Sequence, residues 1–238
     1  TCSTAAGTAA KTVTCNGFIL KTGVTVSITF SKGNTYAGAL TLNVSGTGDK
    51  TICVGGIATS GTNMLYCVLN TMLTFVYDGT NWMLVDSPGT WDGTCTTAAG
   101  TAAKTTTVTT KMAYFRGTKI RVKMSYVNSN TNPTLNISYN NTTYGSCGIR
   151  CNIYNSSGNL IAPYWTSDDG GNSWLANYTA DFVFNGQYWV MEINSTVIDG
   201  GNIITSSVTA NQIDAASWSC SSISSSKSFS SRVSLSKS

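Results

Sequence analysis

The chain contains no histidine, and only 10 % of its 238 residues are charged. Without histidine, the usual Ser-His-Asp and Cys-His catalytic arrangements cannot form. A glycoside hydrolase needs two carboxylates that face each other across a cleft. Asp168 with Glu192 or Asp181 is the pair that could meet in space. We expect no enzymatic activity, with a polysaccharide-cleaving enzyme as the alternative.

Long apolar runs and basic clusters are also missing. No stretch of about 18 apolar residues occurs, so we expect no membrane insertion. The net charge is +4, and the basic residues are scattered except for Lys119, Arg121 and Lys123, which alternate along one predicted strand. Nucleic-acid-binding surfaces combine basic clusters with stacking aromatics. We therefore expect no nucleic-acid partner.

Uncharged polar residues take the place of the missing charges. Threonine, serine, asparagine and glycine are abundant, beside 6 tryptophans, 11 tyrosines, 7 phenylalanines and many valines and isoleucines. A disordered chain has few aromatic and β-branched residues, whereas strands are enriched in both. The composition therefore predicts an all-β protein with uncharged polar outer faces.

One segment of the chain occurs twice. Residues 2–12 (CSTAAGTAAKT) return as residues 95–105 (CTTAAGTAAKT), identical at ten of eleven positions. Shorter repeats follow, TLN(V/I) at 41–44 and 134–137 and FV(Y/F)(D/N)GxxW at 75–82 and 182–189. Such repetition predicts one scaffold used twice. We expect two tandem small β-sandwich or jelly-roll-like domains, residues 1–90 and 91–195, the second with an insert at 147–174.

Strict alternation predicts the clearest strands. In 24–30 and in 120–126 every second residue is apolar, which indicates one buried and one wet face. The residues predicted to point inward are Val24, Val26, Ile28, Phe30, Ile120, Val122, Met124 and Tyr126. Asp78-Gly79 and Asn185-Gly186 predict tight closing hairpins, and the matching Trp82 and Trp189 are expected in the core. Residues 86–94 are rich in turn formers and predict a linker, and residues 64–73 a helical turn.

Eight cysteines are present, but only Cys2 and Cys95 correspond between the copies. A disulfide framework that serves both copies would repeat, so we expect buried reduced thiols. Cys147 and Cys151 suggest zinc, although two further ligands would be needed. We expect no metal and no cofactor.

The insert of the second copy concentrates aromatic and acidic residues. Its members are Tyr164, Trp165, Asp168, Asp169, Asn172 and Trp174. Aromatic rings stack on the apolar faces of sugars, while carboxylates and amides hydrogen-bond the hydroxyls. These residues are therefore candidates for glycan binding. In the alternatives, the aromatics anchor the loop or fill an interface between subunits, or residues 168–172 bind calcium.

Residues 196–238 differ from the rest of the chain. Ile198, Ile203, Val208 and Ile213 recur every five residues, and the stretch from Ser217 onward is rich in serine. A period of five fits neither a helix nor a strand. We expect an extended segment whose apolar row pairs with something else.

The three repeated motifs together resemble a module of bacteriophage and prophage tail fibre and baseplate proteins, and residues 198–215 are similar to linkers in phage minor tail proteins. The resemblance implies a homotrimer on the virion, made in the bacterial host cytoplasm, that contacts other phage tail proteins and binds a host cell-surface polysaccharide. A trimer would pair the five-residue apolar row around its axis. The second copy departs from the pattern by its insert and by Thr109-Thr110, which replaces Asn16-Gly17.

The function expected from the sequence is non-catalytic adhesion. The insert of the second copy is expected to recognise the glycan, and the first copy to act as a spacer. The alternatives are a purely structural spacer or decoration protein, and a capsule polysaccharide depolymerase.

Overall fold

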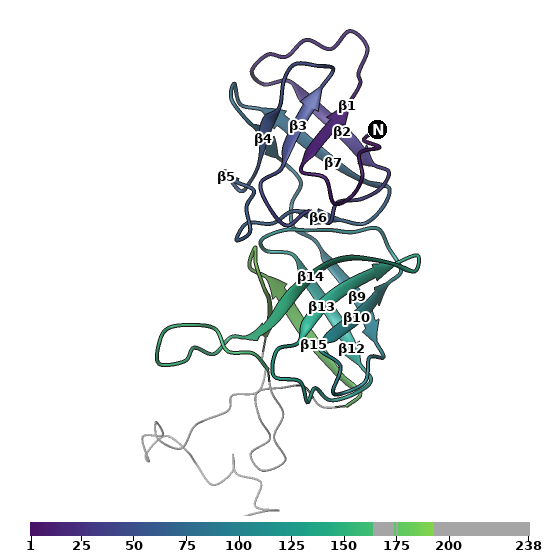
Figure 1. The fold of residues 1–238 in the computed structure, drawn as a ribbon, viewed down its shortest axis with the longest axis vertical. Coiled ribbons are helices and arrows are strands. Elements are labelled where there is room, and N and C mark those ends of the chain that lie inside the picture. The colour runs from purple at the N-terminus through teal and green to yellow at the C-terminus, as the bar shows by residue number, and fades with distance from the viewer. Residues whose placement is uncertain (164–173, 175, 193–238) are drawn as a thin grey trace, which may run out of the picture. The chain divides into compact units, whose positions relative to one another are not determined.

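The computed structural model describes residues 1–163, 174 and 176–192, which form sixteen strands and no helix (Figure 1). The all-β class predicted from the composition is confirmed. No helix suited to crossing a bilayer occurs in this described part of the chain. By its internal contacts, the whole of it belongs to one compact unit.

The first sheet contains seven strands in the order β1-β3-β4-β8-β7-β2, with β5 paired to β4. Their bounds are β1 Ala10–Val13, β2 Thr25–Phe30, β3 Thr41–Val44, β4 Lys50–Val54, β5 Ile57–Ala58, β7 Thr71–Tyr77 and β8 Trp82–Leu84. The predicted hairpin at Asp78-Gly79 is confirmed, because β7 and β8 pair antiparallel and Gly79 has a positive φ. β1 and β2 are the two ends of this order.

The second sheet closes on itself into a barrel and is called the closed sheet below. Its strands are β9 Thr90–Cys95, β10 Ala103–Val108, β12 Lys119–Met124, β13 Thr134–Tyr139, β14 Thr142–Cys151, β15 Tyr178–Phe184 and β16 Trp189–Glu192. Their order is β10-β13-β14-β16-β15-β12-β9. β9 closes the ring because it pairs parallel with β12 and antiparallel with β10.

The repeated sequence corresponds to a repeated strand order. β1, β3, β4, β8, β7 and β2 hold the same places as β10, β13, β14, β16, β15 and β12. The register agrees as well, since Ala10 pairs with Thr41 and Ala103 with Thr134, both in parallel. The division into domains 1–90 and 91–195 stays a prediction, because the described residues pack as one unit.

Alternation places the predicted core side chains correctly with one exception. Trp82 and Trp189 are fully buried, one in each apolar core. Tyr126, predicted to point inward, is 52 % exposed. The reason is that β12 ends at Met124, so the alternation of the strand stops before Tyr126.

Three further sequence predictions are wrong. The expected linker 86–94 contributes most of strand β9, and the expected helical turn at 64–73 contains the short strand β6, Tyr66–Cys67. Residues 147–151 belong to β14 and not to the insert. The connection that follows β14 therefore spans residues 152–177.

Strand β6 pairs with β11, Ala113–Tyr114, and joins the two halves. The ring of Tyr66 lies 4.9 Å from that of Tyr114, whose hydroxyl donates a hydrogen bond to the Tyr144 carbonyl. Tyr66 also packs in the core of the closed sheet, while Phe115 packs in the core of the first sheet. Each core thus contains side chains from the other half.

A buried lysine explains the repeated TAAGTAAK motif. Lys11 donates hydrogen bonds to the carbonyls of Ala5 and Ala6, both at 3.1 Å. Lys104 donates to the matching carbonyls of residues 98 and 99, both at 2.8 Å. Both side chains are 1 % exposed, and burial lowers the pKa of each. The motif therefore fixes a loop around an ammonium group in both halves.

Candidate functional site

The connection between β14 and β15 is longer than the equivalent connection between β4 and β7 in the first half. Its beginning forms a small hairpin in which Tyr154 pairs with Leu160. The side-chain oxygen of Asn155 accepts hydrogen bonds from the amides of Ser157 and Asn159, both at 3.0 Å. Gly158 supplies the positive φ that the turn requires. The sequence thus builds this hairpin from local interactions.

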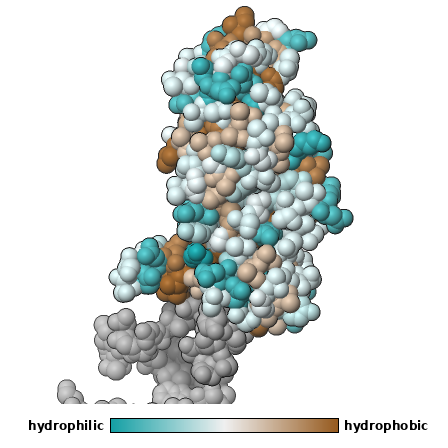
Figure 2. Space-filling model, viewed as in Figure 1, coloured by the Kyte–Doolittle hydropathy of each residue, from teal (hydrophilic) through white to brown (hydrophobic). Residues whose placement is uncertain are grey.

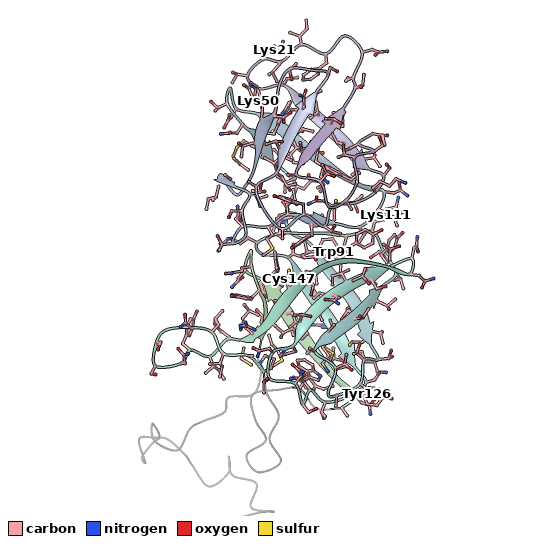
Figure 3. All side chains as sticks on the ribbon, viewed as in Figure 1. Lys21, Lys50, Trp91, Lys111, Tyr126 and Cys147 are labelled. Carbon is pink, nitrogen blue, oxygen red and sulfur yellow. The ribbon has the colours of Figure 1, made fainter. Side chains whose placement is uncertain are left out.

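Two hydrogen bonds hold Pro163 and Trp174 against the connection that follows β12. On one side the buried Asn128 donates a 2.8 Å hydrogen bond to the Pro163 carbonyl. On the other, the Nε1–H of Trp174 donates a 2.9 Å hydrogen bond to the Tyr126 carbonyl. In Figure 3, Tyr126 lies at the end of the closed sheet away from β6. The described residues on either side of 164–173 are thus both held by the connection between β12 and β13.

Of the six predicted glycan-binding residues, Trp174 is the one that the structure describes. Tyr164, Trp165, Asp168, Asp169 and Asn172 lie outside the described residues. Trp174 is 2 % exposed and packs edge-on against Phe182 in the core. A ring without an open face cannot stack on a sugar, so the assignment of Trp174 as a glycan-binding residue is wrong. For this residue the alternative holds, in which the aromatic anchors the loop.

A hollow of about 290 Å³, here called the insert groove, lies between the 152–160 hairpin and the outer faces of β15 and β16. Its lining residues are Asn152, Tyr154, Leu160, Val183, Asn185, Val190 and Glu192. Tyr154 is 63 % exposed, and its ring is the one aromatic surface among them. The groove thus combines an aromatic ring with two amides and one carboxylate.

The sequence analysis did not single out this groove. Its polar residues are spread over 152–192 and look like ordinary surface residues in the sequence. The one signal was the extra length of the second copy, which was assigned to 147–174. Val183 and Val190 reach the groove because they point outward on paired strands, a property that only the register reveals.

Two carboxylates considered for catalysis are neighbours in the structure. Asp181 and Glu192 are cross-strand partners on β15 and β16. Each has a cation beside it: Arg121 donates to Asp181 at 2.8 Å, and the ammonium of Lys119 lies 3.7 Å from Glu192. Because directly opposed residues of a sheet lie on the same face, Asp181 and Glu192 stand side by side. The two carboxylates of a glycoside hydrolase instead face each other across a cleft. The hydrogen bond to Asp181 raises the pKa of the Arg121 guanidinium.

The cysteines of the described residues belong mainly to the cores. Cys2, Cys53, Cys67, Cys95, Cys147 and Cys151 are buried, whereas Cys15 is exposed. Burial raises the pKa of Cys67 and of Cys147 to about 12, so their thiols stay protonated at neutral pH. Within the described ranges, no three His, Cys, Asp or Glu residues lie close enough together to hold a metal ion.

One face of the molecule is mostly of intermediate hydropathy. Figure 2 shows a mostly pale face with scattered hydrophilic and hydrophobic spots.

Comparisons with protein-family models, with curated proteins and with solved structures found no match for this chain.

Proposed function

We propose that this chain is a non-catalytic component of a bacteriophage tail fibre or baseplate, and that its second half binds a host cell-surface glycan. The observation that supports the proposal most is the insert groove, where an exposed tyrosine ring, two amides and a carboxylate line one hollow. The repeated motifs, which resemble those of phage tail proteins, support the location on the virion.

The groove offers both interactions that sugar binding requires. The exposed ring of Tyr154 would stack on the apolar C–H face of a pyranose, and Asn152 and Glu192 would bond its hydroxyls. In Asn185, the side-chain oxygen already accepts hydrogen bonds from the amides of Gln187 and Tyr188. Its amide group is therefore held in place and directed by the turn that it caps.

A hollow of this size contacts one or two sugar units, so a single groove binds weakly. Presentation of three grooves in a homotrimer would raise the apparent affinity through effective concentration without new contacts. In this proposal the first half is a spacer. The other tail proteins would hold the fibre, and no catalytic step is part of the function.

Binding of the full-length protein to a glycan array and to host cells tests the proposal. Replacing Tyr154 by Ala should weaken binding about tenfold or more, which corresponds to about 1.4 kcal/mol, and Asn152→Ala should have a smaller effect. Tyr178→Ala is the matched control, because Tyr178 is an exposed tyrosine of the same sheet that does not line the groove. Trp165→Ala tests the adjoining loop separately.

The outcomes separate adhesion from the competing functions. Binding that survives Tyr154→Ala and Trp165→Ala undiminished would contradict the groove and the loop as the glycan site. Absence of binding by the folded wild-type protein would favour the spacer. Release of reducing sugars from host polysaccharide would favour the depolymerase.

A further inference from the structure

The insert groove has an aliphatic wall beside the ring of Tyr154. Val183 and Val190 are cross-strand partners on β15 and β16, and they line the groove together with Leu160. All three side chains are half-buried. An aliphatic side chain forms no hydrogen bond, so a sugar hydroxyl held against it would lose a bond to water without replacement. The wall therefore favours a sugar with an apolar substituent over a plain hexose.

A hydrogen-bond donor that the turn does not need also lines the groove. The side-chain oxygen of Asn185 caps the turn between β15 and β16 by accepting two backbone amides, at 3.0 and 2.8 Å. In the first half, Oδ1 of Asp78 caps the matching turn in the same way, at 2.7 and 2.6 Å. One oxygen is therefore sufficient for the cap in both halves. The NH2 group of Asn185 is left to donate to an acceptor on a ligand in the groove.

The groove also contains one acidic group, the carboxylate of Glu192. Its Oε1 lies 3.7 Å from the ammonium of Lys119, and its side chain is 44 % exposed. An ionised carboxylate is only an acceptor, so Glu192 is complementary to an N–H or O–H donor on the ligand. The cation beside it balances its charge, which favours a neutral ligand over a sugar with a free ammonium group.

We propose that the glycan bound in the insert groove carries an acetamido sugar such as N-acetylglucosamine, an inference that rests on the proposed function and names its ligand class. An acetamido group combines a carbonyl acceptor, an N–H donor and a methyl group. Its carbonyl accepts a hydrogen bond from the NH2 group of Asn185, and its N–H donates to Glu192. Its methyl group contacts the aliphatic wall while the sugar ring stacks on Tyr154.

Saturation-transfer difference NMR on the full-length protein tests the proposal, with N-acetylglucosamine, glucose and L-fucose as probes. We expect N-acetylglucosamine to bind about tenfold more tightly than glucose, since one apolar group in a complementary pocket typically changes affinity by this factor or more. Its acetyl methyl protons should receive the strongest saturation because they lie against the wall. L-fucose has a methyl group without the amide, so it should bind more weakly than N-acetylglucosamine.

Two variants test the donor and the wall separately. Asn185→Asp keeps the oxygen that caps the turn, as Asp78 does in the first half, but replaces the NH2 donor by an acceptor. It should remove the preference for N-acetylglucosamine over glucose while the Tm stays that of the wild type. Val183→Thr should lower the preference about fivefold, because it adds a hydroxyl to the wall. Val76→Thr is the matched control, since Val76 holds the same position on β7 and does not line the groove.

The outcomes distinguish this inference from the proposed function. If glucose or L-fucose binds as tightly as N-acetylglucosamine and all binding is lost in Tyr154→Ala, the groove is a glycan site but the acetamido assignment is wrong. An Asn185→Asp variant that keeps the full preference for N-acetylglucosamine would overturn the assignment as well. If none of the three sugars binds the folded wild-type protein, the assignment and the glycan site in the groove are both wrong.

Discussion

The two buried lysines provide the most direct test of how the repeated motif stabilises the fold. We expect Lys104→Met to lower the free energy of unfolding by about 2 kcal/mol and Lys11→Met by slightly less. Methionine keeps the length and most of the volume of the lysine side chain, so the change removes the ammonium group with little effect on packing.

The magnitude follows from the hydrogen bonds around the ammonium group. A hydrogen bond from a charged donor contributes about 1.5–3 kcal/mol, and Lys104 makes two, both at 2.8 Å. The acceptor carbonyls of Ala98 and Ala99 each keep a backbone donor, the amides of Thr101 and Ser129, so the loss should fall at the lower end of this range. The substitution also removes the cost of burying a charged group, which offsets part of this loss of stability. The bonds of Lys11 are longer, at 3.1 Å, which is why its substitution should cost less.

Guanidinium chloride unfolding, followed by tryptophan fluorescence at pH 7, measures these differences. Lys21→Met is the matched control, because Lys21 is exposed and its substitution should change the stability by less than about 0.5 kcal/mol. A Lys104→Met variant as stable as the wild type, or more so, would refute the reasoning, since desolvation of the ammonium would then outweigh its hydrogen bonds.

Three further predictions concern the closed sheet and the buried thiols. Burial raises the pKa of Cys67 and Cys147 to about 12 from about 9, so the folded state holds these protons longer; stability is full below pH 9 and should fall as the pH rises toward 12. Urea midpoints measured under reducing conditions should show this fall, and an equally steep fall after Ala replaces both cysteines would contradict it. Gly93→Val should cost about 1–3 kcal/mol by overpacking against β10, and unchanged thermal unfolding would show that the strand can move aside. Trp174→Phe should cost about 1 kcal/mol and lower the Tm by about 2–4 °C, because the Nε1–H bond to the Tyr126 carbonyl is lost; calorimetry with no shift would show that this bond is not needed.

The strands and hairpins could be predicted because their signals are local. Alternation in residues 24–30 and 120–126 marked β2 and β12, and the Asn185-Gly186 pair marked the turn between β15 and β16. Core positions followed from the same alternation until β12 ended at Met124. The sequence placed Tyr126 inward because a period of two says nothing about where a strand stops.

The remaining features depend on partners far away in the chain. Strand β9 looks like a turn-rich linker because Pro88, Gly89 and Gly93 favour turns, and its identity as a strand comes from the edges of β10 and β12 on either side. Lys104 looks like a surface residue until its two carbonyl acceptors are known. The insert groove likewise depends on the register of β15 with β16.

The exchange of side chains through β6 and β11 has a mechanical consequence. Because Tyr66 and Val68 complete the core of the closed sheet, and Ala113 and Phe115 that of the first sheet, neither half can lose its fold without exposing apolar surface of the other. A pulling force on residues 1–192 should therefore meet one cooperative resistance, and single-molecule extension should show one rupture where two independent beads on a string would show two.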